Sequence, residues 1–163
     1  MQLSAQQINF FNTFGYLVVR GLLSPAEVER VTDAFEWTMQ NWGSGRDHDG
    51  SKRTMIAGPI EHAPELCVLL DHPGVLGLIG GVTGADFNYC SGDGNYYTGN
   101  TGWHPDGTYG QLWATKTAFY LDPVCRDSGC LRVIPGSHHP DHFVRKNKIN
   151  VNDAEALYGI AAD

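Results

Sequence analysis

The chain has 163 residues and carries 18 Asp and Glu against 11 Lys and Arg, which gives a formal net charge of −7. This length predicts a single domain, residues 1–163, with enough residues to bury a core. The acidic balance argues against nucleic acid as a partner. The sequence shows neither a membrane-spanning apolar run nor a signal peptide, so we expect a soluble, cytoplasmic protein. In a reducing cytosol its four cysteines are expected to be free thiols.

Residues 1–84 are typical of a mostly helical segment, because two capping boxes mark helix starts. Ser4 and Gln7 form the first box, and the helix they begin is expected to end at Gly15. The second box lies in residues 24–27, Ser-Pro-Ala-Glu, where a proline also occupies the first helical position. Apolar residues at helical spacing extend this second helix to about Trp42.

Shorter elements follow along the chain. The segment Tyr16-Leu17-Val18-Val19 favours a short strand, and the polar, glycine-rich residues 43–53 predict a loop. Residues 64–70 and 74–82 indicate two short helices separated by His72-Pro73.

Residues 85–163 change character and predict strands between Gly, Asp and Asn turns. The expected strands are residues 87–90, 95–98, 112–121 and 130–134, and residues 152–158 indicate a short terminal helix. The order of helices first and strands second predicts an α+β fold, with a helical layer on an antiparallel sheet or barrel.

The segment Thr101-Gly102-Trp103-His104-Pro105-Asp106-Gly107 carries the strongest chemical signal. On an extended chain, residues two apart point to the same face, so His104 and Asp106 can converge on one metal ion. Imidazole and carboxylate donors with open positions are the ligand set of a non-haem Fe(II) oxygenase. A His-x-Asp pair is weak evidence on its own, and its context decides its meaning.

That context resembles the phytanoyl-CoA dioxygenase family of Fe(II)- and 2-oxoglutarate-dependent oxygenases. The resemblance rests on four segments, which are residues 14–19 with 21–24, the His104-x-Asp106 pair, the strand ending Tyr120-Leu121-Asp122, and Gly129-Cys130-Leu131 through Pro135-Gly136-Ser137-His138. It implies N-terminal helices packed on a double-stranded β-helix, the jelly-roll shape also found in cupins. The implied reaction uses Fe(II), 2-oxoglutarate and molecular oxygen to hydroxylate a small organic substrate. Asp106 favours hydroxylation, because related halogenases lack this carboxylate.

The resemblance implies that His104 and Asp106 bind iron together with a distal His. Three further side chains are candidate cofactor contacts. Lys116 would meet a 2-oxoglutarate carboxylate if it faces the barrel interior, and otherwise faces solvent. Tyr97, or its neighbour Tyr96, would line the cosubstrate pocket. Otherwise one of the two tyrosines faces the core and the other the surface. Trp103 would wall the site or simply pack.

The family's distal His and the Arg that follows it are not found after Asp106, where 57 residues remain. Three alternatives stay open: a truncated oxygenase, a barrel completed by a second chain in a homodimer through exposed strand edges, or a non-catalytic relative. The last would be a cupin-like module for small-molecule binding or assembly. The later histidines, His138, His139 and His142, are weaker candidates for the third ligand.

Overall fold

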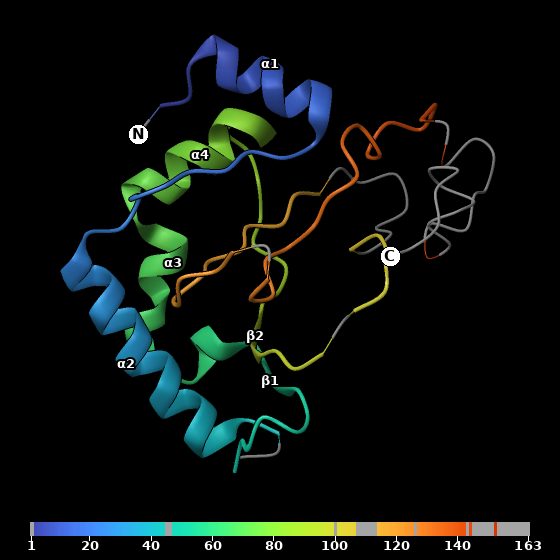
Figure 1. The fold of residues 1–163 in the computed structure, drawn as a ribbon. Coiled ribbons are helices and arrows are strands. Elements are labelled where there is room, and N and C mark those ends of the chain that lie inside the picture. Colours follow the sequence, from blue (N-terminus) through green and yellow to red (C-terminus); the bar gives the residue numbers. More distant parts are fainter. Residues whose placement is uncertain are drawn as a thin grey trace. The chain divides into compact units, whose positions relative to one another are not determined.

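The computed structural model describes residues 2–44, 47–99, 101–106, 114–125, 127–142, 144 and 152 (Figure 1). The chain divides into two compact units. The first unit comprises Met1–Gln2, Val19–Asn100 and Thr117–Cys130, and the second comprises Leu3–Val18, Thr101–Lys116 and Leu131–Asp163. The helical segment and the His-x-Asp motif therefore belong largely to different units.

The longest helix of the first unit, α2 (Pro25–Trp42), starts and ends where the sequence predicts. The Ser24 side chain accepts a hydrogen bond from the Glu27 amide, and the Glu27 carboxylate accepts one from the Ser24 amide at 2.8 Å. These reciprocal bonds satisfy two polar groups that a helix start otherwise leaves to solvent. At the other end, the Gly43 amide donates to the Met39 carbonyl.

A small apolar core lies between α2 and residues 60–69. Val31 from α2 packs with Ala63 and Leu66, and all three side chains are buried. Leu66 belongs to the short 3-10 helix η2 (Pro64–Cys67), which follows another, η1 (Pro59–Glu61). Side chains of Ala34, Phe35, Ile60, Val68, Leu69 and Leu121 surround this cluster.

The predicted helix pair is present as α3 (Val68–Asp71), which continues from η2, and α4 (Pro73–Thr83). His72 separates them, and its Nδ1 accepts a hydrogen bond from the Gly74 amide at 3.0 Å, so it caps α4. In the part of the chain that the structure describes, no single helix is long and apolar enough to cross a membrane. Residues 64–71 and 73–83 pass that test only together, with a bend of 44° between them.

The sheet of the first unit has two antiparallel strands, β1 (Thr54–Ala57) and β2 (Asp93–Tyr96). Thr54 pairs with Tyr96 and Ala57 with Asp93. The strand predicted over residues 95–98 corresponds to β2, displaced two residues toward the N-terminus, whereas β1 was not predicted.

The described residues within the other expected strands are not strands; they are residues 16–19, 87–90, 114–121 and 130–134. A strand exists only where a partner completes its ladder of hydrogen bonds, and β propensity alone does not supply one. The expected helix at residues 152–158 lies almost entirely outside the described residues. Helices with an antiparallel sheet give an α+β fold, and the jelly-roll barrel stays a prediction.

The second unit contains α1 (Ala5–Phe14), whose capping box at Ser4 and stop at Gly15 are as predicted. Gly15 has a φ angle of 80°, which favours glycine because a side chain there is strained. The Gly136 amide donates to the Phe14 carbonyl at 2.8 Å and attaches the turn around residues 134–139 to the end of this helix.

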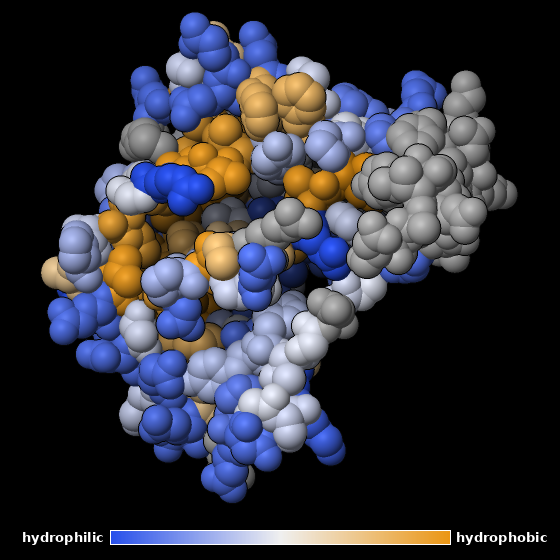
Figure 2. All heavy atoms as spheres, in the orientation of Figure 1, coloured by the Kyte–Doolittle hydropathy of each residue, from blue (hydrophilic) through white to orange (hydrophobic). Residues whose placement is uncertain are grey.

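On the face shown in Figure 2, polar side chains predominate and apolar side chains form patches between them. Large apolar side chains that remain exposed include Val18, Trp42, Tyr97 and Leu131. All four cysteines are free thiols; they are Cys67, Cys90, Cys125 and Cys130. Association through exposed surfaces stays a prediction.

Candidate functional site

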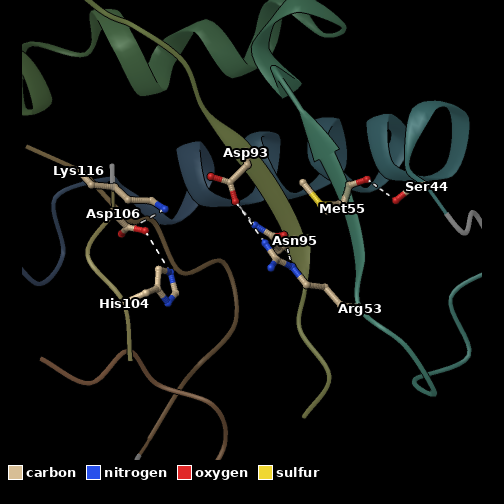
Figure 3. A network of polar contacts seen from close by, with 8 residues as sticks. All are labelled: Ser44, Arg53, Met55, Asp93, Asn95, His104, Asp106 and Lys116. Carbon is tan, nitrogen blue, oxygen red and sulfur yellow. Dashed lines mark hydrogen bonds and ion pairs between the residues drawn. The ribbon is translucent and has the colours of Figure 1, made fainter. Parts of the chain in front are cut away.

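The two expected metal ligands face each other in the second unit. His104 Nε2 lies 3.5 Å from Asp106 Oδ1, and both side chains are about half exposed, at 56% and 50% (Figure 3). Two donor atoms bound to one ion at about 2.1 Å each lie roughly 3–3.4 Å apart when they are neighbours around it. The separation in this structure is therefore close to that of a shared ion.

The orientation of the His104 ring is set by its own backbone. Its Nδ1 lies 2.8 Å from the Gly102 carbonyl oxygen, which can only accept a hydrogen bond, so Nδ1 carries the hydrogen. In the neutral ring, the lone pair is then on Nε2, the atom that faces Asp106. Two lone-pair atoms at this distance are stabilised by a positive charge between them, either a proton or a metal ion. Histidine ligands of metals are commonly held in this way by a backbone carbonyl.

The backbone beside His104 is held by a residue distant in sequence. The Trp103 amide donates to Asn152 Oδ1 at 2.6 Å, and Asn152 Nδ2 donates back to the Trp103 carbonyl at 3.2 Å. Gly102 allows this approach, since a Cβ at that position would lie 2.9 Å from Asn152 Oδ1. Sequence reasoning missed Asn152, because nothing local links it to a segment 49 residues earlier.

Lys116 and Trp103, two of the expected cofactor contacts, also belong to the second unit. Lys116 Nζ lies 3.4 Å from Asp106 Oδ2, and the lysine side chain is 53% exposed (Figure 3). The guanidinium carbon of Arg132 lies 5.2 Å from the centre of the Trp103 ring, a cation–π contact. Arg132 is itself exposed and lies against one face of the Trp103 ring.

Tyr97, the third expected cofactor contact, belongs to the first unit. Its exposed ring lies beneath the Arg53 guanidinium, whose carbon is 4.5 Å from the ring centre. Arg53 Nε donates to Asn95 Oδ1 at 2.7 Å, and its terminal nitrogen lies 3.6 Å from Asp93 Oδ2 (Figure 3). The structure thus assigns Tyr97 to a charged cluster at the end of β2, and its role as a cofactor contact stays a prediction.

Tyr96, the alternative, points its hydroxyl to the Glu36 carboxylate. Burial, together with that carboxylate, raises the pKa of the Tyr96 phenol. This tyrosine therefore stays protonated and binds α2 to the sheet.

The later histidines make other contacts. The Nε2 atoms of His138 and His139 lie 3.0 and 2.9 Å from the carbonyl oxygen of Asn12, at the end of α1. His142 Nδ1 accepts a hydrogen bond from the Val144 amide at 3.3 Å. Across the described ranges, no group of three or more His, Cys, Asp or Glu side chains could hold a metal ion. The described residues therefore supply two donors, His104 and Asp106, and the third ligand stays a prediction.

Comparison with known proteins agrees with the motif. The model of the family described as phytanoyl-CoA dioxygenase (PhyH) matches residues 11–158, which include the whole Gly102–Asp106 segment. No curated protein and no solved structure matches the chain. Because the match extends over most of the sequence, the chain belongs to the phytanoyl-CoA dioxygenase family.

Proposed function

We propose that the chain is a non-haem Fe(II)- and 2-oxoglutarate-dependent dioxygenase that hydroxylates a small organic substrate. The observation that carries this proposal is the convergence of His104 Nε2 and Asp106 Oδ1 at 3.5 Å within a chain of this family. When bound, Fe(II) with 2-oxoglutarate and oxygen supplies the oxidising chemistry.

The two side chains fit that metal by their chemistry. His104 offers a neutral nitrogen whose lone pair is fixed by the bond to Gly102, and Asp106 offers one carboxylate charge. Imidazole and carboxylate are the donors that non-haem Fe(II) oxygenases use. Both side chains are half exposed, so the ion they hold would have room for a further protein ligand, a chelating cosubstrate and oxygen.

The surrounding residues have supporting roles in this proposal. Trp103, which contacts Asn152 through its backbone and Arg132 through its ring, would form one wall of the site next to His104. The Lys116 ammonium places a positive charge beside the pair, which favours an anionic cosubstrate such as 2-oxoglutarate. Tyr97 is the remaining proposed cofactor contact, and its side chain is exposed.

A turnover assay tests the proposal directly. The chain would be supplied with Fe(II), 2-oxoglutarate, ascorbate and air, and succinate would be measured by NMR. Many oxygenases decarboxylate 2-oxoglutarate slowly without their substrate, so the substrate need not be known. We expect succinate from the native chain and none from Asp106→Ala.

The alternative is a non-catalytic cupin-like module for small-molecule binding or assembly. It predicts a folded chain that makes no succinate above the Asp106→Ala background. Equal succinate from both proteins would also contradict the proposed site. Thermal unfolding of both proteins confirms that each is folded before the comparison is made.

A further inference from the structure

Asp106 is contacted through its two oxygens by two different side chains. Oδ1 lies 3.5 Å from His104 Nε2, and Oδ2 lies 3.4 Å from Lys116 Nζ (Figure 3). The two carboxylate oxygens of Asp106, which are chemically equivalent, therefore have different partners.

A half-exposed carboxylate has little to fix its rotation. The torsion that turns an Asp carboxylate is broad and roughly two-fold, so packing or hydrogen bonds must choose its orientation. Asp106 is 50% exposed, and packing restrains it only partly. His104, by contrast, is oriented by a carbonyl of its own segment, at Gly102.

We propose that Lys116 is a positioning residue for the metal site. Its ammonium holds Asp106 Oδ2, so that Oδ1 alone is presented beside His104 Nε2 and Asp106 binds the ion through one oxygen. This inference rests on the proposed function, since it concerns the same ion. Groups that hydrogen-bond to a ligating carboxylate typically change metal affinity by about 10–100-fold when they are removed.

The positive charge of Lys116 also acts against metal binding, and the experiment must separate this repulsion from the positioning of Asp106. An ammonium near a divalent ion repels it, so removing the lysine favours metal binding on electrostatic grounds. Salt weakens this repulsion between exposed groups, because the Debye length falls to about 4 Å at 0.5 M salt. The direct contact between Lys116 Nζ and Asp106 Oδ2 is weakened less, because its 3.4 Å is shorter than that length. Measurements at 0.5 M KCl therefore report mainly on positioning.

The experiment measures Mn(II) affinity of the whole chain by EPR of the free aqua ion, with no turnover involved. Lys116→Met removes the donor and Lys116→Arg retains it. Lys52→Met removes the same charge from the loop before β1 and serves as the matched control. We expect Lys116→Met to raise the Mn(II) Kd about ten-fold at 0.5 M KCl. Lys116→Arg should stay within about two-fold of the native Kd, because it keeps a charged donor beside Asp106. Lys52→Met should also stay within about two-fold, because the charge that it removes lies in the loop before β1.

Asp106→Ala separates failure of this inference from failure of the proposed function. We expect Lys116→Met to add no loss of affinity when Asp106 is already Ala. An unchanged or tighter Kd for Lys116→Met overturns the positioning role, as does an equal loss in Lys116→Arg or Lys52→Met. If Asp106→Ala itself leaves the Kd unchanged, the metal site, and with it the proposed function, is wrong.

Discussion

His104 Nδ1 lies 2.8 Å from the carbonyl oxygen of Gly102, a residue only two positions earlier in the chain. This local bond fixes which ring nitrogen carries the hydrogen and leaves Nε2 to face Asp106. Asp106 instead contacts a residue ten positions later, since its Oδ2 lies 3.4 Å from Lys116 Nζ. One side chain of the pair is thus contacted by its own segment, and the other by a residue from elsewhere in the unit.

Replacing Asn152 by Ala should loosen the segment that carries His104. The change removes both side-chain hydrogen bonds to the Trp103 backbone. Because exposed bonds are partly replaced by water, we expect a loss of about 1 kcal/mol in the free energy of unfolding. Urea denaturation measures this loss. Asn88→Ala, at another exposed asparagine, is the control and should change stability by less than about 0.5 kcal/mol. Equal effects of the two substitutions would contradict the role of Asn152.

Gly15→Ala should destabilise the chain more than Gly21→Ala. Both glycines have positive φ, at 80° and 63°, so either substitution strains the backbone by about 1–2 kcal/mol. At Gly15 the new Cβ would also collide with the His138 ring, whereas nothing lies within 4 Å of it at Gly21. The difference between the two unfolding free energies isolates the steric contribution of His138. If Gly21→Ala costs as much as Gly15→Ala, the packing of His138 on the end of α1 is wrong.

The helices were predictable because their signals are local. Ser4 with Gln7 and Ser24 with Glu27 encode each helix start within four residues, and the structure contains both capping boxes. Gly15 ends the first helix as expected, and the second ends at Trp42, where its helical spacing was expected to stop. Such signals need no knowledge of what the helix packs against.

The strands were less predictable because they depend on a distant partner. β1, residues 54–57, is a four-residue segment after a polar loop, and it pairs with β2 almost forty residues later. Val18 has high β propensity, yet it is 67% exposed and lies outside any strand. Propensity describes a fit to a sheet surface, and the ladder itself is a tertiary property.

The candidate site likewise combines a local feature that the sequence predicts with long-range contacts that it does not. The spacing of His104 and Asp106 predicts that they share a face, and the structure brings their side chains within 3.5 Å. Lys116 was named for a cosubstrate, while its contact with Asp106 was not foreseen. Asn152 gave no signal at all. Contacts across 10 or 49 residues depend on the folded unit, which the spacing of a motif does not encode.

Ser24→Ala should weaken the chain more at neutral pH than in acid. The Ser24 hydroxyl, followed by its backbone amide, lowers the pKa of the Glu27 carboxyl, and His72 and Arg30 add smaller effects in the same direction. A lowered folded-state pKa means that the stabilisation is present above the unfolded pKa. It is lost as the pH falls through the folded pKa.

Urea denaturation at pH 7 and pH 2.5 tests this dependence. We expect the Ser24→Ala effect to be largest at pH 7 and to shrink at pH 2.5. Glu27→Gln is the control, because it keeps a hydrogen-bond acceptor but removes the charge. In that background, Ser24→Ala should show the same effect at both pH values. A Ser24→Ala effect that is independent of pH in the native background would contradict the account.

Cys125 should react with a thiol reagent faster than the other exposed cysteines. The Ser128 hydroxyl donates to the Cys125 thiol sulfur and, with nearby backbone amides, lowers the pKa of that thiol. A lower pKa increases the reactive thiolate near neutral pH. Peptide mapping after brief iodoacetamide labelling at pH 7 should find Cys125 modified before Cys67 and Cys90.

Substitution of Ser128 provides the control for that reactivity. Ser128→Ala should slow labelling of Cys125, while Ser128→Thr, which retains the hydroxyl, should preserve it. Labelling of Cys125 at the same rate in all three proteins would show that the hydroxyl contact does not govern the thiol.

An anaerobic titration with Fe(II) and then 2-oxoglutarate tests the central claim, that His104 and Asp106 form an iron site for this cosubstrate. The readout is the visible metal-to-ligand charge-transfer band of the chelate. We predict that the band grows to saturation with the native chain and is absent with Asp106→Ala, although circular dichroism shows both proteins folded. The absence of a band in the folded native chain, or an equal band in Asp106→Ala, would contradict the assignment of this pair.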